Sequence, residues 1–178
     1  TAYEIVDCDW SSDVCSSDLR LNGEVIDPAG HATDLFTDWA CAYLRGRNAA
    51  SPPFFLYLAY TAPHFPIEPP AEWLERVKRR APTMDPKRAA NVALVEHLDA
   101  AVGRVLEELR RQGLEQNTLV FFTSDNGGSL PHGASNAPWR GGKQDHYEGG
   151  LRVPFLARWP GKIAAGGGTT ENALTFDI

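Results

Sequence analysis

The sequence predicts an α/β fold in which helices cover both faces of a mostly parallel sheet. Two apolar runs carry that prediction: residues 118–123, which are β-branched and aromatic, and residues 54–60, which are continuously apolar. Such runs are typical of strands that are buried within a sheet. Between them, residues 85–111 carry apolar side chains at helical spacing. The order strand, helix, strand is the unit from which a sheet covered on both faces is built.

The composition is that of an ordinary globular chain, with 178 residues, 43% hydrophobic and 22% charged. A net charge of −6 without a basic stripe gives no indication of nucleic-acid binding. No run approaches the ~18 apolar residues that a membrane span needs. The three cysteines, Cys8, Cys15 and Cys41, have no metal-type spacing, and Cys41 is expected in the core.

The first 30 residues are the least defined part of the chain. Residues 11–19 repeat Ser-Ser-Asp and have neither helical nor strand periodicity. Two interpretations stay open for this segment: a polar loop, or a foreign insertion that has no part in the fold. After it, Asn22-Gly23 lies between short apolar runs, which predicts a hairpin turn.

Three helices are expected in the first two thirds of the chain. Thr33-Asp34 can cap the first, which would run to about Arg47 with one apolar face: Leu35, Trp39, Ala42 and Tyr43. Residues 71–80 predict a short second helix. The third covers 85–111, is stopped by Gly113, and has an apolar face made of Ala90, Leu94, Leu98, Ala101 or Val102, Val105 and Leu109. His97 and Asp99 on this helix are interpreted as structural or solvated.

Polar side chains follow both predicted buried strands, at the edge where open α/β sheets bind their ligands. Asp125 and Asn126 come after the run 118–123 and offer oxygen atoms suited to Ca²⁺ or Mg²⁺, although the same residues are also ordinary turn chemistry. His64 follows the run 54–60 within a proline-rich loop. A loop histidine is commonly just exposed, but flanking prolines suit a positioned acid or ligand.

A long glycine-rich loop continues from Asp125 to Gly150 and precedes a third short strand over 152–158. A proline in this strand indicates either a non-central position or a bulge. Lys143 lies in the glycine-rich loop. Oxygen ligands for a cation, a lysine and a histidine together suit the binding of a tetrahedral oxyanion ester. In such a site His64 could protonate a leaving oxygen.

From about Leu21 to Ile178 the chain resembles the later part of the catalytic domain of the sulfatase family, within the alkaline-phosphatase-like superfamily. The resemblance implies a partial alkaline-phosphatase-like sandwich whose N-terminal half is missing. It is carried by short motifs in a fixed order: residues 53–57, 62–66, 117–120, 124–127, 140–143, 147–154 and 159–161.

The resemblance implies a role for each matching residue. Asp125 and Asn126 match the family's second pair of metal ligands, usually for Ca²⁺, with Mg²⁺ as an alternative. His64 matches a histidine that contacts the sulfate ester near the leaving oxygen. Lys143 matches a lysine that binds the sulfate and assists the leaving group. We expect these residues to be catalytic and substrate-binding.

Other loop residues are given structural roles. Glu148 and Arg152 match a motif that shapes the loop behind Lys143, and a buried ion pair is expected there. His132 and His146 are interpreted as loop histidines, with substrate recognition as the alternative.

Three features of the family are absent from the chain. No cysteine or serine lies in the Cys/Ser-x-Pro-x-Arg segment that is converted to the formylglycine nucleophile. The family's first metal-ligand pair, Asp-Asp, and its Gly-Lys-x-His segment are missing as well, and all three normally lie upstream. We therefore expect residues 21–178 to be a fragment of a sulfatase, inactive and poorly folded alone.

The parent protein is expected to hydrolyse a small-molecule or glycan sulfate ester. The family's usual export suggests a periplasmic or secreted location. Two alternatives stay open: a phosphoester or phosphonate hydrolase of the same superfamily, and a non-catalytic relative that binds sulfate or metal.

Overall fold

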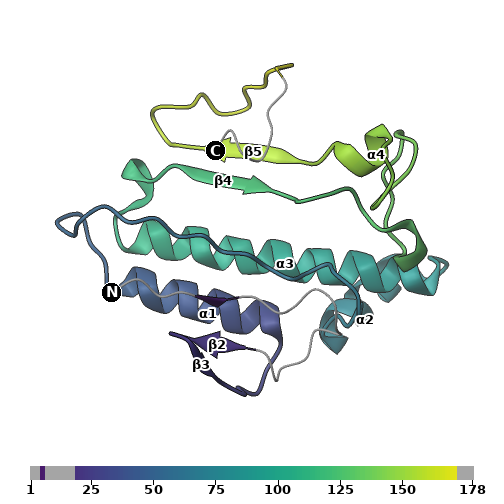
Figure 1. Ribbon diagram of the computed structural model, residues 1–178, viewed down its shortest axis with the longest axis horizontal. Coiled ribbons are helices and arrows are strands. Elements are labelled where there is room, and N and C mark those ends of the chain that lie inside the picture. Colours follow the sequence, from purple (N-terminus) through teal and green to yellow (C-terminus); the bar gives the residue numbers. More distant parts are fainter. Residues whose placement is uncertain (1–4, 7–18, 172–178) are drawn as a thin grey trace. The chain divides into compact units, whose positions relative to one another are not determined.

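The computed structural model describes residues 5–6 and 19–171 (Figure 1). The chain divides into two units, residues 1–112 and residues 113–178. Cys8, Cys15 and most of the segment 11–19 lie outside the described residues. No helix among the described residues is long and apolar enough to cross a membrane.

The first unit is built around three helices: α1 (Ala32–Arg45), α2 (Ala71–Arg80) and α3 (Pro86–Arg111). Both shorter helices pack against α3 (Figure 1). The sequence predictions for α2 and α3 are confirmed. The Asp85 side chain caps α3 by accepting a hydrogen bond from the Arg88 N–H at 3.0 Å, and Pro86 suits the first helical turn because its φ is already helical.

The prediction for α1 is right in extent but wrong in its cap and its buried face. The cap is His31, whose Nδ1 accepts from the Thr33 N–H at 3.2 Å. The buried side chains are shifted from those predicted: Thr33, Phe36, Thr37, Ala40, Cys41 and Leu44. A hydropathy pattern misses this face because it counts threonine as polar. The buried Thr37 hydroxyl is hydrogen-bonded within the protein: it donates to the Thr33 carbonyl at 2.6 Å and contacts the Tyr60 hydroxyl at 2.9 Å.

The core of the first unit lies along α3. The predicted residues Leu94, Leu98, Ala101 and Leu109 are buried, whereas Ala90 is only partly so. Cys41 is buried as expected, and burial raises the pKa of its thiol. A second part of the core joins α2 to α3 through three buried residues: Val77, Ala89 and Ala93.

The predicted buried strand over 54–60 is not found as a strand. No partner strand is hydrogen-bonded to it among the described residues. Its side chains nevertheless alternate in exposure: Phe54 packs edge-on against the Tyr43 ring, whereas Phe55 and Tyr57 are 88% and 80% exposed. The segment is therefore covered on one face only, which the continuous apolar run did not indicate.

A small antiparallel sheet precedes α1. It consists of β1 (Ile5–Val6), β2 (Arg20–Leu21) and β3 (Glu24–Val25). The predicted hairpin turn is confirmed, since Asn22 and Gly23 join β2 to β3 with φ values of 54° and 85°. Both lie in the left-handed region that such two-residue hairpin turns require.

The second unit contains an antiparallel pair, β4 (Val120–Thr123) and β5 (Phe155–Arg158), with the Phe121 and Phe155 rings in contact. Both runs are strands as predicted, but β4 is not buried, because Phe121 is 41% exposed. The mostly parallel sheet is also not seen: both sheets of the described residues are antiparallel. The loop between β4 and β5 reverses the chain, so β5 returns alongside β4 in the opposite direction.

Candidate active site

The turn after β4 presents two oxygen-bearing side chains. The amide Nδ2 of Asn126 donates to the Asp125 carboxylate, and the Ser124 hydroxyl donates to the Asn126 carbonyl at 3.0 Å. Asp125 is exposed and Asn126 is half-buried. Because Nδ2 of Asn126 makes this bond, its Oδ1 is not engaged by the carboxylate and is a second oxygen of metal-ligand type in the turn.

Backbone hydrogen bonds fix this turn against the far end of the loop. The Gly127 N–H donates to the Gly150 carbonyl at 2.9 Å, and the Lys143 N–H donates to the Gly128 carbonyl at 3.1 Å. Lys143, far along the loop, is thereby tied directly to the residues that follow Asp125 and Asn126. Three of the four predicted site residues therefore lie in the second unit, on backbone segments that these hydrogen bonds join.

Close approach of backbones explains the glycines of this loop. A Cβ on Gly127 would lie 1.8 Å from the Gly149 carbonyl oxygen, and one on Gly142 would lie 2.6 Å from the Gly128 carbonyl oxygen. Real side chains do not tolerate such distances. The glycines therefore permit the contacts that hold Lys143 beside the turn.

Sequence reasoning missed Asn136, which joins the same backbone segments. Its Oδ1 accepts from the Gly128 N–H at 2.8 Å, and its Nδ2 donates to the carbonyls of Gly128 and Gly141 at 2.9 and 3.1 Å. One side chain thus satisfies three backbone groups on the two sides of the loop. The only signal in the sequence is an amide within a glycine-rich loop, which does not separate this role from an exposed one.

His64 belongs to the first unit. Its backbone N–H donates to the Thr61 carbonyl at 2.8 Å, and its Nδ1–H donates to the Phe65 carbonyl at 2.7 Å. The half-buried ring is flanked by Pro63 and Pro66, both of which follow cis peptide bonds. Because Nδ1 holds a proton for the carbonyl, Nε2 is the nitrogen through which His64 would exchange a proton with a ligand.

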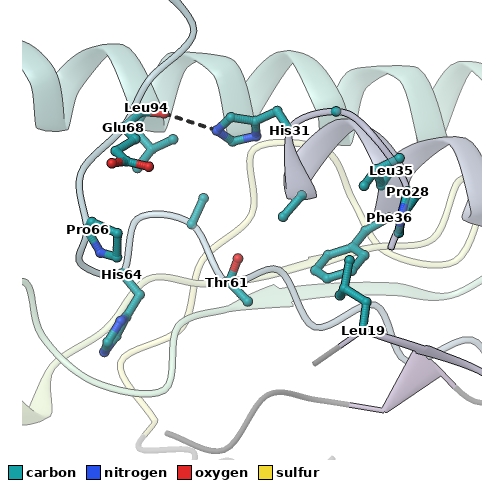
Figure 2. A pocket seen from close by; sticks show the side chains of 13 residues that line it. Leu19, Pro28, His31, Leu35, Phe36, Thr61, His64, Pro66, Glu68 and Leu94 are labelled. Atoms are coloured by element: carbon teal, nitrogen blue, oxygen red, sulfur yellow. Dashed lines mark hydrogen bonds between the residues drawn. The ribbon is translucent and has the colours of Figure 1, made fainter. Parts of the chain in front are cut away.

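His64 lies at the edge of a cavity of about 320 Å³ within the first unit (Figure 2). His31 and Glu68 line the same cavity, and the figure shows the hydrogen bond from the His31 ring to the Glu68 carbonyl. Burial, and next to it the neighbouring His97, lowers the pKa of His31 below the usual value of a histidine.

The remaining loop residues depart in part from expectation. Glu148 and Arg152 do form an ion pair, one helical turn apart across α4 (Glu148–Leu151), but their side chains are 55% and 59% exposed, so the predicted buried pair is wrong in its burial. A pair at the exposed end of so short a helix is solvated on most sides. His132 is hydrogen-bonded to the Ser129 hydroxyl at 2.8 Å, and His146 is exposed.

Asp125 and Asn126 suit a calcium ion by the kind of their donor atoms. Carboxylate and amide oxygens are its preferred ligands, and no imidazole or thiolate belongs to the turn. Ca²⁺ takes about six to eight oxygens. The turn therefore fits as part of a calcium site, with the remaining ligands to come from elsewhere.

Comparison with known proteins gives one consistent result. The sequence model of the sulfatase family matches residues 4–177. N-acetylgalactosamine-6-sulfatase of Mus musculus is 40% identical over 138 residues, which are 75% of this chain and 25% of that protein. A sulfatase of Formosa agariphila is 37% identical over 159 residues, which are 83% of this chain and 28% of that protein.

Solved structures that resemble this chain give the same result as the sequence comparison. The crystal structure of Ps i-CgsB in complex with k-i-k-neocarrahexaose has a TM-score of 0.77 and 36% identity, covering 83% of this chain and 32% of that one. A protein described under the metabolism of multiple glycosaminoglycans by Bacteroides thetaiotaomicron has a TM-score of 0.67 and 26% identity. The chain thus spans about a quarter to a third of the length of these relatives.

Proposed function

Because the chain belongs to the sulfatase family, we propose that the protein carrying it hydrolyses sulfate monoesters, releasing an alcohol and inorganic sulfate. The observation that supports this most directly is the hydrogen bond between the Lys143 N–H and the Gly128 carbonyl. It ties the backbone of Lys143 to the segment that follows Asp125 and Asn126, which supports a shared site for these residues. A cation and a metal-ligand pair on adjacent backbone segments suit an anionic tetrahedral group such as a sulfate ester.

Each proposed residue has a separate task. The ammonium group of Lys143 would neutralise charge on the sulfate oxygens and on the leaving oxygen. His64 would give the leaving oxygen a proton from Nε2 while its Nδ1–H remains bound to the Phe65 carbonyl. Asp125 and Asn126 would hold the calcium ion, which when bound supplies positive charge to the sulfate group.

The nucleophile must come from another part of the protein. No cysteine or serine of this chain is followed by x-Pro-x-Arg. The formylglycine and the first metal-ligand pair are therefore proposed to lie on the part of the parent that this chain does not contain.

A sulfated glycan is the substrate class to test first. The mouse relative is named N-acetylgalactosamine-6-sulfatase, and Ps i-CgsB was crystallised in complex with k-i-k-neocarrahexaose. A small aryl sulfate is the second class. A periplasmic or secreted location fits the glycan substrate, since polymeric glycans lie outside the cytoplasm.

The test compares Lys143→Ala with Lys162→Ala in the full-length protein. Lys162 is exposed in the second unit and takes no part in the site. Loss of an oxyanion-stabilising group lowers kcat about 10²- to 10³-fold. We expect that loss of sulfate release for Lys143→Ala and none for Lys162→Ala. Equal activity of the two variants would contradict the assignment of Lys143.

A parallel assay separates the rival functions. If the full-length protein releases phosphate faster than sulfate from matched nitrophenyl esters, the phosphoester or phosphonate hydrolase is favoured. If it binds Ca²⁺ and sulfated glycan but releases neither anion, it is a binding protein.

A further inference from the structure

Three side chains of metal-ligand type meet between α1 and α3, in the first unit and outside the candidate active site. His31 caps α1, Asp34 lies in its first turn, and His97 lies midway along α3. One donor atom from each lies within 4.8 Å of the other two, a group called the His31 cluster below. His97 is almost fully buried, with a side chain only 6% exposed.

Residues of the His31 cluster make two contacts, one within the cluster and one to Glu68, whose lengths suit a bound ion as well as a hydrogen bond. His97 Nε2 lies 3.2 Å from Asp34 Oδ2, and His31 Nε2 lies 3.2 Å from the Glu68 carbonyl oxygen. These are long for hydrogen bonds, whose N···O distance is usually about 2.9 to 3.0 Å. Ligands of a tetrahedral zinc ion, at about 2.0 to 2.1 Å from the metal, lie about 3.3 Å from one another.

Unsatisfied polar atoms gather at the same place. Among the described residues three buried side-chain atoms have no hydrogen-bond partner, and two of them are His97 Nδ1 and the Thr33 hydroxyl oxygen. Thr33 is the residue whose N–H contacts the His31 ring. Buried polar atoms without partners are rare and commonly indicate a missing ion or water.

The surroundings orient the ligands and leave a route to them. Arg104 donates to Oδ1 of Asp34 at 3.2 Å, so the other oxygen, Oδ2, faces His97. The cavity in Figure 2 is lined by His31 and by Glu68. An ion could therefore reach the His31 cluster from solvent on the side where the Glu68 carbonyl lies.

We propose that the His31 cluster binds one Zn²⁺ ion, through imidazole nitrogens of His31 and His97 and the Asp34 carboxylate, with the Glu68 carbonyl completing the shell. Two imidazoles with one carboxylate are typical zinc ligands, whereas Ca²⁺ and Mg²⁺ prefer oxygen alone. The ion would fasten the loop before α2 to both α1 and α3. This site is independent of the proposed sulfatase activity and of the calcium ligands Asp125 and Asn126.

Binding would rearrange two weak contacts. When the metal takes the place of the Nε2 proton of His31, the ring would release that proton to solvent and take up one proton on Nδ1, so the imidazole stays neutral. The unpartnered hydroxyl of Thr33, whose N–H contacts the same Nδ1, would be the acceptor for the new Nδ1–H. The Thr33 N–H would lose its 3.2 Å contact in exchange.

The experiment measures zinc binding by the full-length protein, after complete removal of metals and refilling with Ca²⁺. The variants are His31→Asn and the control His146→Asn, an exposed histidine outside the cluster. Asparagine is a good N-cap, so His31→Asn keeps the start of α1 while removing the imidazole. Calorimetric titration with Zn²⁺ gives stoichiometry and affinity, and Co²⁺ gives the visible absorption of a four-coordinate site.

We expect His31→Asn to lose one zinc equivalent or to bind it at least about tenfold more weakly, with unchanged helical circular dichroism. The control His146→Asn should keep the zinc equivalent. Asp125→Ala should keep it as well, and this result would distinguish the zinc site from the proposed calcium site. Equal zinc binding by His31→Asn and the unmodified protein would overturn the proposal, as would equal loss in His146→Asn. His97→Gln, if it folds, should repeat the result of His31→Asn.

Discussion

The backbone N–H of Gly127 donates to the carbonyl of Gly150 at 2.9 Å, joining the turn after β4 to the far end of the long loop. A Cβ at position 127 would lie 1.8 Å from the Gly149 carbonyl oxygen. Gly127→Ala must therefore separate the two segments. We expect it to lower the free energy of unfolding by at least about 2 kcal/mol and to weaken calcium binding. Urea denaturation and calcium titration of the full-length protein measure both effects.

Gly103→Ala is the matched control. Gly103 is exposed within α3, and a Cβ there meets nothing within 4 Å. Alanine in the middle of a helix is preferred to glycine by about 0.5 to 1 kcal/mol, so this variant should be slightly more stable. If Gly127→Ala is as stable as Gly103→Ala, the close approach of Gly127 to Gly149 does not stabilise the loop.

Asn136 is predicted to be essential for the loop although it touches no ligand. In the wild-type protein Nδ2 of Asn136 donates to the carbonyls of Gly128 and Gly141. In Asn136→Asp the side chain keeps its size, but a carboxylate oxygen faces these carbonyls instead of a donor. Leaving buried groups unsatisfied costs about 1 to 3 kcal/mol. We expect a loss of that size at pH 7 and a partial recovery at low pH, where the new carboxyl is protonated and can donate again.

Asn48→Asp is the control for this prediction. The Asn48 side chain accepts one hydrogen bond, from the Ala50 N–H at 2.9 Å, and a carboxylate can accept the same bond. The change in unfolding free energy should stay within about 0.5 kcal/mol, as for most surface substitutions. Equal effects of the two variants in urea denaturation would show that Asn136 has no special role.

The sequence was sufficient where local rules decide the structure. The span of α3 follows from its apolar periodicity, its Asp85 cap and the glycine after its end. The sequence likewise predicted that Asp125 and Asn126 follow a strand and that Lys143 lies in the loop after them, which the structure shows. Their proximity within the loop comes from backbone hydrogen bonds such as Lys143 to Gly128, which no side-chain pattern encodes.

The failures have physical reasons. The buried face of α1 was displaced because Thr37 is satisfied internally by the Thr33 carbonyl and the Tyr60 hydroxyl, whereas hydropathy counts threonine as polar. The run 54–60 was interpreted as a buried strand because it is continuously apolar. Burial and pairing depend on neighbours that the segment itself does not specify, and Phe55 is 88% exposed.

Calcium dependence should follow Asp125. If Asp125 and Asn126 hold the ion, a chelator should abolish sulfate release by the full-length protein, and added Ca²⁺ should restore it. In Asp125→Asn the charge is lost but an oxygen remains, so we expect at least about tenfold more Ca²⁺ to be needed for half-maximal activity. The control is Asp99→Asn, an exposed aspartate on α3.

Two results would contradict this assignment. One is activity that persists after the chelator has removed all calcium. The other is an unchanged calcium requirement in Asp125→Asn, because the neutral amide is a weaker calcium ligand than the carboxylate it replaces.

We expect the apolar run 54–60 to make the isolated chain prone to self-association. Phe55 and Tyr57 lie on its open face, 88% and 80% exposed, while Phe54 packs against the Tyr43 ring on the other face. An apolar segment that pairs with no strand of the described residues offers a hydrophobic face and a backbone edge to another chain. We therefore expect the 178-residue chain to bind the dye ANS and to form oligomers in sedimentation velocity.

Substitutions on the two faces of the segment should have opposite consequences. Phe55→Ser with Tyr57→Ser removes exposed apolar surface, so dye binding and oligomers should fall by about half or more without loss of thermal stability. Phe54→Ser removes a packed ring and should instead destabilise the first unit by about 2 to 4 kcal/mol while leaving the open face unchanged. A wild-type chain that stays monomeric and binds no dye would disprove the exposed face. Equal effects of the double variant and of Phe54→Ser would disprove the alternation of exposed and packed side chains along this segment.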